Sequence, residues 1–394
     1  MTLRSGQPYR IIFLGLLVLW LIMPLLLADV AQDAVPMAVA GRLLADRPDA
    51  IYPGPDGGIF DPQPAFADKS RQYYSGSTWR GHVVAFIASP LALPLVRALP
   101  QSPRAASVVY RELGMLAYVL GMAGLWQRLV TREPKAAEAI VYGTILLTWF
   151  VVYPMALAQT SPFMFLAVSL SPSRAGREPR AAFVFGMVMA VCIAFKAFPL
   201  LLLVVPLWHR QWRPILWTAA FVAALTALTL LAAPPQIWTA FAANSMRLAA
   251  TGMDNPYNGS VDAVLNVLGF RSLALALGIR VAIVVTVGLA LGKMEDPDSR
   301  WACAWSALLV LFPQVWGHYS AILFAGMATV LVERPDRRRF LWTLPVIGAL
   351  LVPVALNPAT SVGPVLRLTA NGVGLLITLV VAMSPVRART SLAD

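Results

Sequence analysis

Two aspartates follow the first apolar stretch of the chain at a spacing that permits acid–base chemistry. Asp29 and Asp33 lie four residues apart, just after the apolar run 11–27, so they share one face if a helix continues beyond that run. A carboxylate that is partly desolvated at a membrane boundary can act as a general base on a hydroxyl group. The alternative is that both residues are solvated and merely end a helix.

Lys196 is the second unusual residue, because it lies within the otherwise apolar run 181–207. An ionisable group in such a run is costly and usually has a function. If the run forms a helical hairpin, Lys196 lies at its outer tip on the same side as Asp33, where its ammonium suits a phosphate or diphosphate oxygen. A lysine that extends to the membrane interface is the alternative.

The segment 313–319, PQVWGHY, interrupts a later apolar hairpin with two aromatic rings and a histidine. Trp316 and Tyr319 fit an interfacial aromatic belt. His318 is less expected there, since it offers a proton relay or a donor to a phosphate. His82, at the end of the first outer loop, is a candidate for the same role.

The amino-acid composition indicates whether these residues belong to a soluble protein or to a membrane protein. Of 394 residues, 58% are hydrophobic and only 13% are charged, whereas a soluble domain is about one quarter charged. The composition therefore excludes a soluble globular protein, a disordered chain and a disulfide-rich secreted module. The net charge of +12 indicates cytoplasmic loops rather than a nucleic-acid partner.

Apolar runs long enough to cross a bilayer recur along the whole chain, and basic clusters separate them in pairs. This pattern predicts an all-α polytopic integral membrane protein with about twelve transmembrane helices, in a range of ten to thirteen. The run 82–99, which contains Pro90 and Pro94, is expected to be re-entrant or interfacial. The expected crossings lie near residues 11–27, 105–125, 139–158, 160–171, 181–195, 197–208, 215–233, 272–291, 301–313, 318–332, 341–356 and 367–384.

This topology predicts one polytopic domain over residues 1–394, with a long first extracytoplasmic loop at 29–81 and a second large outer loop at 234–271. Seven of the nineteen acidic residues lie in the first loop, and a loop of that length is usually functional. Chemistry is therefore expected on the outer side.

Neutral polar residues on the same side are of the kind that bind sugar hydroxyls. Gln159 and Asn258 are the candidates, although Asn-Gly is also a common turn dipeptide. The triplet Asp296-Pro297-Asp298 has the outline of a nucleotide-sugar metal motif, but the topology puts it on the opposite side with Lys293 and Arg300. We therefore expect neither a metal site nor a cofactor.

Several short motifs occur in an order that resembles one family of GT-C-type membrane glycosyltransferases. The pieces are Asp33 with Gly41-Arg42-Leu43-Leu44 and Ile51-Tyr52, then Ser89 to Pro94, Ala158-Gln159-Thr160, Lys196 to Pro199, Asn258-Gly259-Ser260 and Pro313 to Tyr319. The family that the chain resembles is glycosyltransferase family 87, the family of mycobacterial mannosyltransferases. The chain departs from the family pattern at Met37, Ala88-Ser89-Pro90 and Asn266, and these departures leave the donor sugar and the acceptor open.

The resemblance implies a function and a role for each candidate residue. A hexose, with mannose first, would be transferred with inversion from a polyprenyl-phosphate donor to a glycolipid or polysaccharide acceptor at the extracytoplasmic face of the cell membrane. Asp33 would be the base, with Asp29 as its rival. Lys196, His318 and His82 would hold the donor phosphate, and the sugar pocket would contain Gln159, Asn258, Trp316 and Tyr319.

Two other classes of protein fit parts of the sequence. A transporter or flippase of a lipid-linked sugar also needs charged groups within the membrane, but it has little use for a long acidic outer loop. A purely structural membrane component leaves Lys196 and the segment from Trp316 to His318 unexplained. A membrane hexosyltransferase accounts for all three features.

Overall fold

The computed structural model of the chain describes residues 7–26, 31, 33–54, 62–73, 86–100, 102–157, 159–251, 258–270, 272–312, 317–333, 340–356 and 363–384. These residues form α-helices and short 3-10 helices, with no β-strand among them. The predicted all-α class is therefore confirmed.

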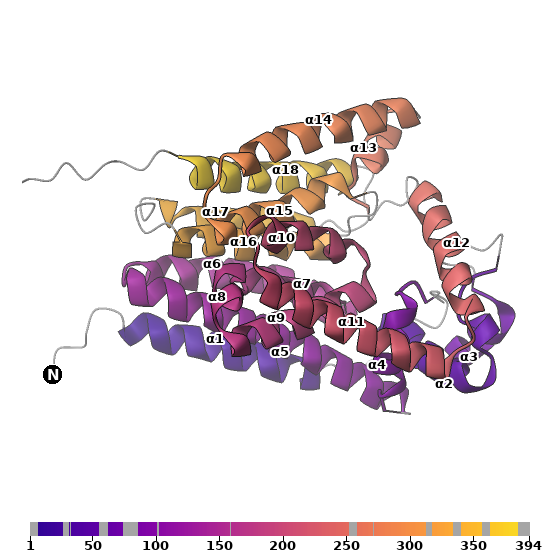
Figure 1. Ribbon diagram of the computed structural model, residues 1–394. Helices are drawn as coiled ribbons and strands as arrows, with labels where there is room; N and C mark the ends of the chain where they lie inside the picture. Colours follow the sequence, from indigo (N-terminus) through magenta and orange to yellow (C-terminus); the bar gives the residue numbers. More distant parts are fainter. Residues whose placement is uncertain are drawn as a thin grey trace, which may run out of the picture.

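Most of the helices run alongside one another in a single elongated bundle (Figure 1). The bundle helices are α1 (Gln7–Leu26), α5 (Pro103–Arg132), α6 (Ala136–Leu157), α7 (Ser161–Ser169), α9 (Pro179–Phe195), α10 (Val204–Trp208), α11 (Trp212–Ala232), α14 (Leu273–Gly292), α15 (Pro297–Leu311), α16 (Ala321–Glu333), α17 (Thr343–Leu356) and α18 (Gly363–Met383).

Shorter elements join or flank the bundle. They are α2 (Ala34–Asp46), η1 (Pro48–Ala50), α3 (Pro64–Tyr73), η2 (Pro90–Ala92), α4 (Leu93–Arg97), α8 (Pro172–Arg177), η3 (Phe198–Leu203), α12 (Gln236–Thr251), α13 (Val261–Val267) and η5 (Gly317–Ser320). The described part of the run 82–99 forms only η2 and α4, so it contains no helix long enough to span a bilayer, in agreement with the re-entrant or interfacial expectation.

Helix starts follow local sequence signals. Ser102 caps α5 by accepting a hydrogen bond from the Ala105 N–H at 3.4 Å, and Pro103 follows at the first helical position. The side-chain oxygen of a serine or aspartate cap accepts a hydrogen bond from an N–H that has no partner in the helix. A proline at the first helical position has no N–H, so it leaves one fewer unpaired donor. The same arrangement begins α8 at Ser171 and α15 at Asp296.

Five helices are long and apolar enough to cross a membrane: α1, α5, α11, α14 and α18. Five shorter apolar helices accompany them. Large apolar side chains face outward along the first group, for example Leu231 of α11, which is 86% exposed. An exposed apolar surface is unfavourable in water but not in lipid, so these helices are compatible with a multi-pass membrane protein. The count of twelve crossings and the two outer loops stay predictions.

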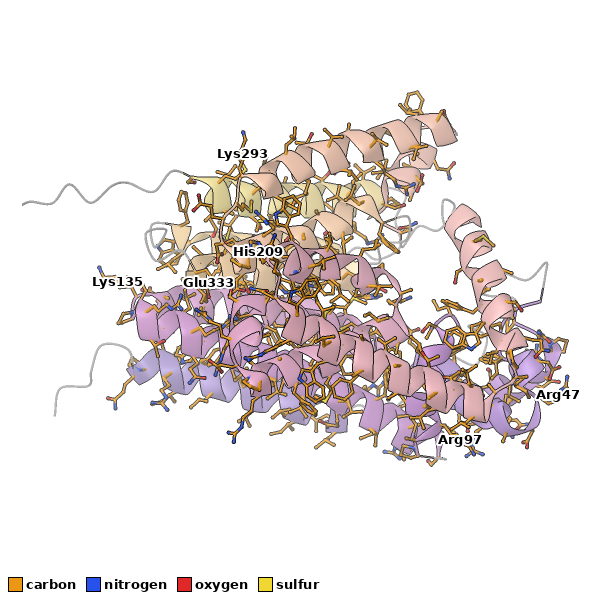
Figure 2. All side chains as sticks on the ribbon, viewed as in Figure 1. Arg47, Arg97, Lys135, His209, Lys293 and Glu333 are labelled. Carbon is orange, nitrogen blue, oxygen red and sulfur yellow. The ribbon has the colours of Figure 1, made fainter. Side chains whose placement is uncertain are left out.

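The bundle has two chemically different ends. Figure 2 shows Arg47 and Arg97 at one end, and Lys135 and Glu333 at the other. We call the first the Lys196 end, because α9 finishes there, and the second the Asp298 end, because α15 begins there. The basic clusters that predict cytoplasmic loops include Lys135, at the second end.

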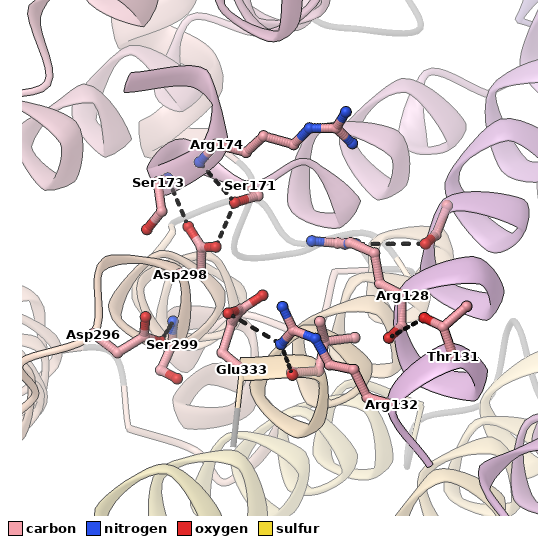
Figure 3. Close-up of polar contacts among 12 residues, drawn as sticks. Arg128, Thr131, Arg132, Ser171, Ser173, Arg174, Asp296, Asp298, Ser299 and Glu333 are labelled. Carbon is pink, nitrogen blue, oxygen red and sulfur yellow. Dashed lines mark hydrogen bonds and ion pairs between the residues drawn. The ribbon is translucent and has the colours of Figure 1, made fainter. Parts of the chain in front are cut away.

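Polar contacts tie the helices together at the Asp298 end (Figure 3). Asp298 is buried and accepts hydrogen bonds from the Ser171 hydroxyl and, at 2.8 Å, from the Ser173 N–H. Asp296 caps α15 by accepting from the Ser299 N–H at 2.6 Å. Both aspartates of the triplet therefore bind neighbouring backbone and hydroxyl groups.

Four hydrophobic clusters of described residues fill the bundle, and two of them are large cores. The main core lies between the long helices and includes Phe198 and Tyr319. A second cluster, here called the α2 core, joins α2, α3 and α4 to the ends of α5 and α9 and includes Tyr110 and Phe195. Gly41 lets α2 approach α4 closely, since a Cβ there would lie 2.7 Å from the Val96 carbonyl oxygen.

Candidate active site

Asp33 lies at the start of α2 rather than on the first helix. α1 ends at Leu26, and Asp33 is the residue that precedes the first turn of α2. The condition for a face shared with Asp29, a first helix that continues to residue 33, is therefore not met. Pro36 gives the physical reason, because its ring is tolerated in a first turn but would clash inside a helix arriving from residue 29. Asp29 lies outside the described residues.

The carboxylate of Asp33 is not used to cap its own helix. An aspartate at this position normally accepts a hydrogen bond from an N–H of the first turn. Here the segment is held by a different contact, in which the Ala31 N–H donates to the Ser107 hydroxyl of α5 at 3.2 Å. The carboxylate can therefore interact with groups outside α2.

Lys196 lies where α9 ends, in the connection to η3. Its N–H closes the last turn by donating to the Cys192 carbonyl at 2.8 Å, and Pro199 prevents the helix from continuing. Ser89 binds the same turn: its hydroxyl and its N–H both donate to the Ala194 carbonyl, at 2.7 Å and 3.1 Å. α9 thus ends where the sequence predicts a turn, and the outer position of that turn stays a prediction.

Asp33 and Lys196 are brought close enough to interact electrostatically. Desolvation by the surrounding protein raises the pKa of the Asp33 carboxyl to about 7, and the Lys196 ammonium partly opposes that rise. Desolvation likewise lowers the pKa of Lys196 to about 8, and the carboxylate partly opposes that fall. Shifts of this kind place a base and a cation in a working range near neutral pH.

His318 and Tyr319 of η5 complete one side of the site. Both are buried, their rings are 4.4 Å apart, and His318 interacts electrostatically with Lys196 while Tyr319 interacts with Asp33. The Ser320 hydroxyl fixes η5 to α18 by donating to the Asn371 carboxamide oxygen at 2.7 Å. Phe198, just after Lys196, packs on Tyr319 with ring centroids 6.1 Å apart.

Two buried polar atoms around this group have no hydrogen-bond partner among the described residues: the Tyr110 hydroxyl and Nε2 of His318. Tyr110 interacts electrostatically with Asp33, and the Tyr319 hydroxyl approaches Thr160. Buried polar groups are normally paired. A cluster of unpaired ones beside a carboxylate and an ammonium is typical of a site that binds a polar ligand.

Tyr110 and Arg367 belong to this neighbourhood and were not expected from the sequence, whereas Thr160 belongs to the Ala158-Gln159-Thr160 motif. A tyrosine within a helix carries no signal of its own. Arg367 does: it lies in an apolar run, is buried and interacts electrostatically with His318.

The remaining expected residues are less closely connected to Asp33. Gln159 lies half-buried in the turn before α7, next to Thr160. Asn258 is buried, and its carboxamide oxygen accepts a hydrogen bond from the Ser260 N–H at 3.1 Å, just before α13. His82 and Trp316 lie outside the described residues. Among the described residues, no three histidine, cysteine, aspartate or glutamate side chains are grouped so as to hold a metal ion.

The motifs that flank the site are linked to one another in space. The Tyr52 hydroxyl donates to the Ala88 carbonyl at 2.8 Å, and the next residue, Ser89, binds the turn before Lys196. The Thr229 hydroxyl of α11 donates to the Pro90 carbonyl at 3.0 Å. Segments far apart in the sequence therefore assemble around one pair of charges.

Comparison with known proteins identifies the family of the chain. No curated protein and no solved structure matches the chain. The model of glycosyltransferase family 87 matches residues 83–316, which is more than half of the chain and includes Lys196. The chain therefore belongs to glycosyltransferase family 87, and it is a membrane glycosyltransferase that acts on a sugar donor and an acceptor.

Proposed function

We propose that this glycosyltransferase moves a hexose, most simply mannose, from a polyprenyl-phosphate donor to a glycolipid or polysaccharide acceptor, with inversion. The observation that carries the proposal is the approach of Asp33 to Lys196 with His318 beside them. A sugar phosphate needs a cation at the phosphate, and an acceptor hydroxyl needs a base. The three residues supply both groups within one site.

The reaction balances without a further reagent. Asp33 removes the proton of the acceptor hydroxyl, and the oxygen forms a bond to the anomeric carbon. The bond between that carbon and the phosphate oxygen breaks on the opposite face, and the electron pair leaves with the polyprenyl phosphate. Lys196 and His318 stabilise the developing negative charge, which is the usual role of preorganised donors and cations at a leaving group.

The other candidate residues complete this site in the proposal. Gln159, Asn258, Trp316 and Tyr319 bind the sugar hydroxyls, and His82 assists at the phosphate. Asn258 has to share its carboxamide with Ser260, because its oxygen already accepts that N–H. Asp29 is the rival of Asp33 as the base.

The proposed location is the cell membrane, with the active site on the extracytoplasmic face. Its support is the charge distribution. Lys135, Arg177 and Lys293 belong to basic clusters at or near the Asp298 end, and the positive-inside rule assigns such clusters to the cytoplasm. Asp33 and Lys196 then face outward.

A direct assay separates a transferase of this kind from a transporter. The purified protein in lipid nanodiscs is given polyprenyl-phosphate mannose, or polyprenyl-phosphate glucose as an alternative hexose donor, with a glycolipid acceptor. We expect release of polyprenyl phosphate and an acceptor that is longer by one hexose, both detected by mass spectrometry. In vesicles, movement of the intact lipid-linked sugar with no bond broken under any donor would favour the transporter instead.

A further inference from the structure

A cleft of about 610 Å³ opens at the Asp298 end of the bundle, between α8 and the turn that joins α10 to α11. Arg177, Arg210, Arg213 and Trp212 line it, together with small or neutral residues. No acidic residue is among the described residues that line this cleft. We call it the arginine cleft.

The three arginines of the cleft are not neutralised by acidic side chains. None of them forms an ion pair in the part of the chain that the structure describes. Glu178, which follows Arg177, pairs instead with Arg174 at 2.8 Å. One contact orients the group: Nη1 of Arg213 donates to the Arg177 carbonyl at 2.7 Å, which holds α11 against α8. The cleft thus keeps a local excess of positive charge.

The backbone strengthens this charge. Arg210 has a left-handed conformation, with φ of 55°, and the chain reverses there before α11 begins at Trp212. The positive end of the dipole of the 21-residue helix α11 therefore lies at the cleft. Unpaired N–H groups at a helix start add to arginines in attracting an anion.

Tryptophans around the cleft indicate where it lies relative to a bilayer. Trp208, Trp212 and Trp217 are 61%, 55% and 40% exposed. Exposed tryptophans at the end of an apolar helix are typical of the membrane–water interface. Beyond them, α11 presents apolar side chains such as Leu228 to the surroundings. A ligand in the cleft can therefore place a charged group among the arginines and hydrocarbon along α11.

We propose that the arginine cleft binds a phosphate-bearing anion, namely the phosphodiester headgroup of an anionic membrane lipid. Arginine is suited to this ligand because its planar guanidinium binds two phosphate oxygens at once. The cleft is separate from the transferase site: Arg177 precedes α9 and Lys196 follows it, so the 17-residue helix puts about 25 Å between them. The proposal does not depend on the identity of the donor sugar.

Lipid binding to the purified full-length protein tests this assignment. Detergent-solubilised protein is titrated with phosphatidylglycerol or with phosphatidylcholine, and bound lipids are counted by native mass spectrometry. We compare R177Q/R210Q/R213Q with R10Q/K135Q/K293Q, which removes the same charge from exposed positions outside the cleft. If R177Q/R210Q/R213Q fails to fold, the double variant R177Q/R210Q is used in its place, because it keeps the Arg213 contact.

The wild-type protein and the control variant are expected to retain one phosphatidylglycerol in preference to phosphatidylcholine. The cleft variant should bind it on the order of 100-fold more weakly, because each basic residue near an anionic lipid contributes about a fivefold gain. If both variants bind phosphatidylglycerol equally well, or lose its binding equally, the arginine cleft is not the lipid site. Inorganic phosphate is the second arm: its displacement of phosphatidylglycerol at low millimolar concentration would overturn the lipid assignment in favour of a soluble phosphate.

Discussion

Ser89 donates two hydrogen bonds to the carbonyl oxygen of Ala194, one from its hydroxyl at 2.7 Å and one from its N–H at 3.1 Å. Both residues are buried, and Ala194 lies two positions before Lys196. The contact joins the segment before η2 to the last turn of α9. The position of the Lys196 ammonium therefore depends on a residue that is distant in the sequence.

Substitution of Ser89 by alanine tests this dependence. The variant keeps the N–H contact and loses the hydroxyl contact, which should cost about 1 kcal/mol of stability. It should also weaken donor binding, since the turn that carries Lys196 is less constrained. Ser306→Ala is the matched control, because it also removes a buried hydroxyl bonded to a carbonyl, that of Ala302 within α15. Thermal unfolding and donor titration of both variants give the comparison, and equal donor affinity would contradict the role of Ser89.

Asp33→Asn should lower turnover by about 10²- to 10⁴-fold, the usual cost of losing a general base. Donor affinity should stay nearly unchanged, because a base acts in the transition state and contributes little to ground-state binding. Steady-state kinetics and a separate donor-binding measurement distinguish the two effects.

Two variants control the Asp33 experiment. Asp46→Asn changes the exposed aspartate at the other end of α2 and should leave turnover close to wild type. Asp29→Asn should have a milder effect than Asp33→Asn. If Asp29→Asn abolishes turnover while Asp33→Asn does not, the base is misassigned between these two residues.

Lys196→Ala should weaken donor binding as well as turnover. A cation that holds the phosphate acts in the ground state and in the transition state, so its removal affects both. A hydrogen bond to a charged group is worth about 1.5–3 kcal/mol, which corresponds to roughly 10- to 100-fold in donor Kd. Lys293→Ala, at an exposed position near the Asp298 end, removes the same charge and should leave the Kd unaltered.

The pH profile of kcat/KM should be bell-shaped. Activity rises as pH passes about 7, because Asp33 must lose its proton to act as a base. It falls as pH passes about 8, because Lys196 must keep its proton to stabilise the phosphate. Lys196→Arg should lower the activity but remove the alkaline fall, since a guanidinium stays charged. An unchanged alkaline limb in this variant would assign that limb to another group.

Single cysteines test the sidedness of the bundle. Asp68→Cys lies on an exposed position of α3, and Lys135→Cys lies at the Asp298 end. An impermeant thiol reagent added to intact cells should label the first and spare the second. The natural Cys192 and Cys303 are buried, so their background should be low. Labelling of Lys135→Cys from outside would reverse the proposed orientation.

The helical class, the turn at Lys196 and the interruption at His318 were all predictable from the sequence. Each depends on a local rule: apolar runs favour helices, and a charge or a histidine within such a run marks a turn or a site. These signals lie within a few neighbouring residues, so they can be found without the fold.

The contacts that complete the site were not predictable in this way. Tyr110 is an ordinary polar residue of α5 and Thr160 lies just before α7, and only the packing of these two helices puts them beside Asp33 and Tyr319. The face shared by Asp29 and Asp33 was conditional on a first helix that continues to residue 33, because a four-residue spacing has meaning only inside one continuous helix, and the structure places Asp33 at the start of α2 instead. Where a helix stops is determined by several weak preferences together.

The two large hydrophobic cores of the chain meet at Lys196, since Phe195 on one side belongs to the α2 core and Phe198 on the other belongs to the main core. Lys196 is desolvated at this boundary too, but its ammonium interacts there with the Asp33 carboxylate, a partner that an apolar core does not offer. The apolar residues that flank Lys196 thus stabilise the fold, whereas Lys196 itself is available for the proposed reaction.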